Sequence, residues 1–95
     1  MKLIAQIESE TKMTIKVRLF AALREAMGRD HVELSLSAGA TPEDVWRSLL
    51  SMDASGSLQA RRTNLAAAVN RRYAKFDAVL ADGDEVVFIP PVSGG

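Results

Sequence analysis

The stretch Asp82–Gly95 reads D-G-D-E-V-V-F-I-P-P-V-S-G-G, and it decides how the rest of the chain is interpreted. Asp82-Gly83 is typical of a tight turn, because glycine readily adopts a positive φ. The β-branched and aromatic residues of 85–89 predict a strand. Pro90 and Pro91 lack amide donors, so pairing within a sheet must end there while the backbone stays extended. The sequence therefore predicts a strand that leads into an extended tail.

The tail, Pro90–Gly95, can reach about 20 Å beyond the sheet at roughly 3.3 Å per residue. It carries no charged side chain, so it is suited to a narrow channel in a partner protein. The final Gly94-Gly95 pair leaves the last carbonyl sterically open, and an activated carboxylate can accept a nucleophile. Glycine is also tolerated at inert, disordered termini. The strand, the double proline and the uncharged spacer together favour the functional interpretation.

The composition indicates one small domain. The chain has 95 residues, 47% of them hydrophobic, and its twelve basic and twelve acidic residues cancel, which argues against general attraction to nucleic acid or membranes. Without cysteine, and with His31 as the one histidine, neither a disulfide framework, a thiol nucleophile nor a metal site is expected. The chain has no membrane-length apolar run and no recognisable secretory signal, so we expect a cytoplasmic protein.

Alternating segments predict the first half of the fold. Thr14–Phe20 is typical of a half-buried strand, with Phe20 on its outward face. A short helix over Ala21–Met27 should end at Gly28, which suits a left-handed cap. A second strand over His31–Leu36 should pair antiparallel with the first. The inward residues of both strands are expected to be Ile15, Val17, Leu19, Val32, Leu34 and Leu36.

A longer helix is predicted to begin at Pro42, with Thr41 as its N-cap and acidic residues in its first turn. Its apolar stripe comprises Val45, Trp46, Leu49, Leu50 and Met52.

The second half is predicted from shorter signals. Ser57–Thr63 is interpreted as a polar connection, and Leu65–Asn70 as a strand that enters a turn. An irregular crossing over Lys75–Ala81 is expected to cover one end of the core with Phe76, Val79 and Leu80.

These elements predict an α+β fold of the β-grasp, or ubiquitin-like, type. The first hairpin and the last strand would share a mixed sheet, with the N-terminal strand central, the last strand parallel beside it and the long helix packed across one face. Residues 13–95 would form this domain, with 90–95 as the tail. Residues 1–12 are interpreted as an N-terminal extension: an appended segment, an earlier start codon or an extra turn of helix.

Three stretches resemble the small subunit of molybdopterin synthase: Ile15–Glu25, Ala66–Asn70 and Asp82–Gly95. The resemblance spans Met13–Gly95 and implies a ubiquitin-like sulfur carrier. In that family an activating enzyme, similar to those that activate ubiquitin, uses ATP and Mg²⁺ to adenylate the terminal glycine. The adenylate becomes a thiocarboxylate, whose sulfur is delivered within the large subunit to cyclic pyranopterin monophosphate to form the dithiolene of molybdopterin.

The resemblance also assigns roles along the tail. Gly95 would bear the sulfur, Gly94 would keep the inserted end narrow, and the arm would comprise Pro90, Pro91, Val92 and Ser93. A heterotetramer of two small and two large subunits is implied, with no stably bound cofactor. The carrier itself supplies no acid, base or metal, so the catalytic groups would come from its partners.

By analogy with this family and with ubiquitin, an apolar patch on the exposed sheet face should dock the partners. Its candidates are Phe20, Tyr73 and Ile89, although ordinary packing could also explain each of them, and Ile89 stands where an aromatic residue is common in the family. Arg24 is a candidate for an interface salt bridge. A basic set is interpreted as solvated, or as meeting acidic residues of the activating enzyme, rather than as a nucleic-acid site: Arg61, Arg62, Arg71, Arg72 and Lys75.

No catalytic carboxylate pair is expected, because Glu33, Asp44 and Glu85 fall on different elements.

Other functions remain open at this point. The chain could carry sulfur for thiamine or an amino acid, act as a ubiquitin-like modifier attached to lysines through Gly95, or be a plain β-grasp binding module. The run Phe88–Val92 favours molybdopterin.

Overall fold

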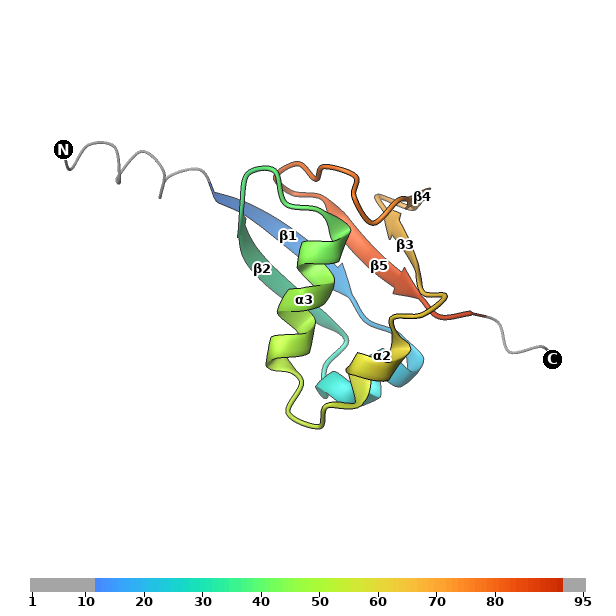
Figure 1. Ribbon diagram of the computed structural model, residues 1–95. Helices are drawn as coiled ribbons and strands as arrows, with labels where there is room; N and C mark the ends of the chain where they lie inside the picture. The colour runs from blue at the N-terminus through green and yellow to red at the C-terminus, as the bar shows by residue number, and fades with distance from the viewer. Residues whose placement is uncertain (1–11, 92–95) are drawn as a thin grey trace.

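The computed structural model describes residues 12–91, so the expectations for residues 1–11 and for Val92, Ser93, Gly94 and Gly95 lie outside the described residues. A five-stranded sheet has the order β2-β1-β5-β3-β4 (Figure 1). Helix α3 (Pro42–Met52) crosses one face of it. The two shorter helices are α2 (Ala21–Met27) and the 3₁₀ helix η1 (Ser57–Arg61). The strands are β1 (Lys12–Arg18), β2 (His31–Ser37), β3 (Ala66–Val69), β4 (Arg72–Ala74) and β5 (Glu85–Ile89).

The predicted mixed sheet is confirmed. β1 pairs antiparallel with β2 from Lys12↔Ser37 to Arg18↔His31, and parallel with β5 from Lys16↔Glu85 to Arg18↔Val87. β1 is therefore an interior strand, while the middle position belongs to β5. No helix within residues 12–91 is long and apolar enough to cross a bilayer.

The first strand begins and ends two residues earlier than predicted, but its faces are as expected. Ile15 and Val17 are fully buried, and so is Leu19, which follows the strand. On β2, Val32 is buried, whereas Leu34 and Leu36 are only half-buried, because an edge strand has a neighbour on one side alone.

The predicted start of α3 is confirmed and contains a capping box. The Thr41 hydroxyl accepts a hydrogen bond from the Asp44 amide at 3.3 Å, and the Asp44 carboxylate accepts one from the Thr41 amide at 2.9 Å. Val45, Trp46 and Leu49 are buried, as predicted. Met52 is not, since it is the last residue of the helix and is 43% exposed.

Phe88 on β5 is the centre of an aromatic column that joins the sheet to α3. Its ring packs edge-on against Trp46, with centroids 5.2 Å apart, and stacks on Phe76 at 5.9 Å. The guanidinium of Arg62 lies 3.6 Å from the centre of the Phe76 ring and donates to Glu43 at 2.7 and 3.1 Å. Arg62 is therefore a structural residue, and its assignment to a merely solvated basic set was wrong.

The structure corrects three expectations in the second half. The connection after α3 is not simply polar, because η1 buries Leu58 completely. The crossing covers the core with Leu80 and the half-buried Phe76, while Val79 is 73% exposed. After the predicted β3, Asn70 and Arg71 form a turn with positive φ at both residues, which leads into the unpredicted edge strand β4.

The loop after α3 is organised by the buried Asp53. Its carboxylate accepts hydrogen bonds from the Ser55 hydroxyl at 2.7 Å and the Leu58 amide at 2.9 Å, and these bonds hold the pKa of Asp53 below its usual value of 3.8. A lowered pKa stabilises the fold above the unfolded-state pKa, and that stabilisation is lost as the pH falls through the folded-state value.

Asp53→Asn should therefore lower the thermal midpoint at pH 7, and the difference from wild type should shrink as the pH falls below about 4. Thermal unfolding followed by circular dichroism across this range would measure it. Asp77→Asn removes an exposed carboxylate and is the matched control. A difference that stays constant with pH would show that the Asp53 charge contributes nothing.

Candidate docking face and tail root

The tail leaves the sheet from the end of its middle strand. Ile89 pairs with Ala66 at the last rung between β5 and β3, and the following Pro90 and Pro91 are exposed. Because proline cannot donate to a ladder, the chain has no means of continuing the sheet at this point. The predicted strand end is confirmed, and we call Pro90-Pro91 the tail root.

The start of β5 is held by side chains as well as by the ladder. Asn70 donates from its side-chain amide to the Asp84 carboxylate at 2.9 Å and accepts from the Glu85 amide at 3.0 Å. The Thr14 amide donates to the Asp82 carboxylate at 2.7 Å. These contacts link three segments and fix the register of the strand that carries the tail.

Strand register brings the outward residues of three strands into one apolar row. Val87 on β5 pairs with Ala68 on β3, which pairs in turn with Tyr73 on β4. Tyr73 is 79% exposed, and Ile89, two positions beyond Val87, is half-exposed on the same face. We call this surface, opposite α3, the docking face. It holds two of the predicted patch residues; Val87 and Ala68 were not predicted.

The other two predicted residues lie beside the end of β1. Phe20 is 51% exposed and is the N-cap residue of α2, and the amide of Arg24 donates to its carbonyl at 3.3 Å. This bond places Arg24 one helical turn after Phe20, and the Arg24 side chain is exposed. The guanidinium of Arg18 lies 5.9 Å from the centre of the Phe20 ring. Both residues are available to a partner near the end of the sheet from which the tail leaves.

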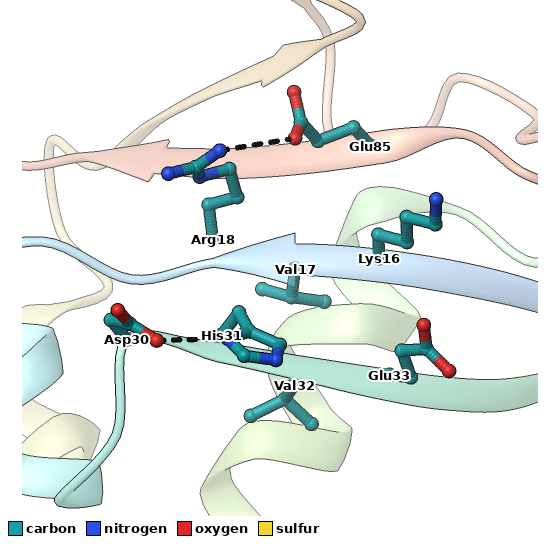
Figure 2. Close-up of a pocket in the computed structure, with 8 residues that line it drawn as sticks. All are labelled: Lys16, Val17, Arg18, Asp30, His31, Val32, Glu33 and Glu85. Atoms are coloured by element: carbon teal, nitrogen blue, oxygen red, sulfur yellow. Dashed lines mark hydrogen bonds and ion pairs between the residues drawn. The ribbon is translucent and has the colours of Figure 1, made fainter.

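A charged groove of about 370 Å³ occupies the other half of the open sheet face (Figure 2). Lys16 pairs across the strands with both Glu33 and Glu85, while Arg18 lies 3.9 Å from Glu85. Glu33 and Glu85 lie on different strands, as expected, but strand register places both beside Lys16. Because Lys16 lies between them, the arrangement is a charge-balanced surface and not an acid–base pair.

His31 closes the groove and is exposed, as predicted. Its ring nitrogen lies 2.8 Å from the Asp30 carboxylate, and this hydrogen bond lowers the pKa of Asp30. No group of three or more histidine or acidic residues within 12–91 is arranged to hold a metal ion. The groove was not predicted from the sequence, although charged residues that alternate with apolar ones on the facing strands indicate such a surface.

A helix across one face of a mixed sheet, an open face opposite it and a chain that leaves the middle strand at two exposed prolines define a ubiquitin-like β-grasp protein. Comparison with known proteins agrees: the chain belongs to the ThiS family, whose model matches residues 17–95. The molybdopterin synthase sulfur carrier subunit of Escherichia coli is 40% identical over 81 residues, which cover 85% of this chain and 99% of that one. The Arabidopsis thaliana subunit of the same name is 33% identical over 96 residues, covering 99% and 98% of the two chains.

Among solved structures, the crystal structure of SAMP1 from Haloferax volcanii superimposes with a TM-score of 0.74 at 28% identity. The match covers 86% of this chain and 99% of that one. The predicted β-grasp fold and the predicted resemblance are both confirmed.

Proposed function

We propose that the chain is the sulfur carrier subunit of a molybdopterin synthase. Gly95 is adenylated by an activating enzyme that uses ATP and Mg²⁺, is converted to a thiocarboxylate, and donates its sulfur to cyclic pyranopterin monophosphate in a large subunit. The observation that carries the proposal is the 40% identity to a carrier subunit over nearly its whole length. The tail root supports it, because the chain leaves the sheet at two exposed prolines, Pro90 and Pro91, on the way to Gly95.

The chemistry requires little of the carrier. Adenylation joins the Gly95 carboxylate to AMP and releases pyrophosphate from ATP, which makes the carbonyl open to attack by a sulfur nucleophile. When the nucleophile is a donor's persulfide, its outer sulfur displaces AMP to give an acyl disulfide. A second donor thiol then cleaves the S–S bond, which frees the terminal thiocarboxylate and leaves the donor as a disulfide. The carrier must present its terminus and dock its partners, and the docking face is suited to the second task.

The test is intact-mass spectrometry of the chain after incubation with the activating enzyme, Mg-ATP and a sulfur donor. We expect replacement of one oxygen by sulfur, and a mass that stays unchanged when ATP is omitted. An unchanged mass under conditions that convert the E. coli carrier would contradict the proposal.

A second candidate function is a ubiquitin-like modifier, joined through Gly95 to lysine side chains. The structural similarity to SAMP1 favours it, since a second H. volcanii structure, with a TM-score of 0.75 at 25% identity, is described as small archaeal modifier protein 1. Pull-down of the tagged chain separates the two: a large subunit held without a covalent bond supports the carrier, and a spread of isopeptide-linked proteins supports the modifier.

A further inference from the structure

The tip of the β3–β4 hairpin places an arginine in a conformation that glycine usually occupies. Asn70 and Arg71 have φ of 52° and 72°, a combination for which two-residue hairpins usually place glycine second. Asn70 tolerates this region and is held by its bonds to Asp84 and Glu85. Within residues 12–91 the Arg71 side chain makes no hydrogen bond or ion pair to offset the steric cost. A local rule broken without structural compensation is a mark of functional sites.

The same hairpin exposes a concentration of positive charge. Arg71, Arg72 and Lys75 are exposed, and no ion pair among the described residues involves them. The adjacent acids are already engaged, Asp84 with Asn70 and the Ala81 amide, and Glu85 with Arg18. We call the segment Asn70–Lys75 the cationic hairpin.

The cationic hairpin adjoins the docking face and lies at the opposite end of β5 from the tail root. Tyr73 ends the apolar row, so hairpin and docking face are continuous. The tip follows Val69, which pairs with Val86 near the start of β5, whereas the tail root follows Ile89 at its end. Five strand residues span roughly 16 Å. The hairpin cations are therefore placed to act on the approach of a partner to the docking face.

We propose that the cationic hairpin docks an acidic surface of the enzyme that adenylates Gly95, with Arg71 and Lys75 as its steering charges and Tyr73 as its apolar contact. The inference rests on the proposed function. Loading is a transient encounter that must form and dissociate at every turnover, and complementary charge at an interface rim raises the association rate. A nucleic-acid partner fits less well, because the chain has no net charge and the cations adjoin an apolar row.

The experiment compares Arg71→Gly with Arg71→Lys, Lys75→Gln and a matched control, Arg47→Gln, which removes an exposed charge from α3 on the opposite face. Kinetics of ATP–pyrophosphate exchange and association rates on the immobilised enzyme are measured at low salt and at about 0.5 M salt. Arg71→Gly should raise the thermal midpoint by about 3–6 °C, because the left-handed strain is relieved. It should also raise KM about two- to fivefold at low salt with kcat unchanged.

Lys75→Gln should raise KM similarly, while Arg71→Lys and Arg47→Gln should stay near wild type. The differences should vanish at high salt, where charges are screened within a few ångströms. An Arg71→Gly variant that is more stable with unchanged KM overturns the proposal. An equal rise in KM for Arg47→Gln also overturns it. So does a loss of affinity that the Arg71 and Lys75 variants show only for the large subunit, or only for labelled duplex DNA, when binding to each is measured in parallel.

The two proposals can fail separately. A wild-type chain that binds the enzyme with the expected salt dependence but yields no adenylate contradicts the carrier function alone, and the variants are then compared by their dissociation constants for the enzyme. A wild-type chain that does not bind the enzyme contradicts both.

Discussion

Deletion of Gly95 should reduce sulfur transfer by at least about 100-fold and leave the thermal midpoint within about 1 °C of wild type. The new terminus would lie roughly 3.3 Å short of its working position, and displacement of a reacting group by even 1 Å can cost about that factor. The thermal midpoint should not change, because the buried core lies within residues 13–88 and the tail root is exposed. Single-turnover formation of molybdopterin from a thiocarboxylated carrier measures the first effect, and calorimetry the second.

The control is Gly95→Ala, which keeps the length and adds one methyl group at the terminus. If the length of the tail limits the reaction, Gly95→Ala should reduce sulfur transfer less than the deletion does. An equal reduction would mean that the partner's channel has no room for a methyl group at the last residue. Retention of full transfer by the deletion variant would exclude Gly95 as the reacting residue. A large fall in its thermal midpoint would assign the tail a structural role.

Phe88→Ala should destabilise the protein by about 3–5 kcal/mol, a large part of the stability of a domain of this size. The ring is 1% exposed and contacts both Trp46 and Phe76, so its removal leaves a cavity between the sheet and α3. It would also deprive Phe76, and the Arg62 guanidinium stacked on it, of support. The thermal midpoint should fall by about 15–30 °C, or the variant should be unfolded at room temperature.

Val87→Ala is the matched control, because it truncates the neighbouring residue on the docking face. It should change the free energy of unfolding by less than about 1 kcal/mol. Urea denaturation of the two variants gives the comparison. Equal losses would mean that the two faces of β5 contribute equally to the core, contrary to the burial pattern.

Elements with a strong periodic or capping signal were predictable from the sequence. The alternation of β1 and β2, the Thr41 cap of α3 and the turn before β5 each have a local physical cause, and each is confirmed. The elements that were not predicted have no such local cause in the sequence. β4 has three residues at a sheet edge, and its turn uses Asn70-Arg71 in place of the glycine that usually marks such a hairpin. Burial of Leu58, and exposure of Val79, depend on tertiary packing.

The candidate site was predictable where exposure follows from alternation along a predicted strand, as for Ile89, whereas Tyr73 lies on β4, which was not predicted. The apolar row and the charged groove depend on which residues lie opposite each other, and register between distant strands cannot be read from either strand alone. Glu33 and Glu85 illustrate this point, since both flank Lys16 although they belong to different segments.

The place of β5 in the sheet also constrains how the protein is made. This strand is the last to be synthesised, yet it lies between β1 and β3 and is the only link between the two halves of the described sheet. A growing polypeptide can form its N-terminal hairpin early, but it cannot join the two halves of the sheet until β5 has left the ribosome. A chain interrupted before β5 would therefore lack the strand that joins β1 to β3, and the two parts of its sheet would stay separate.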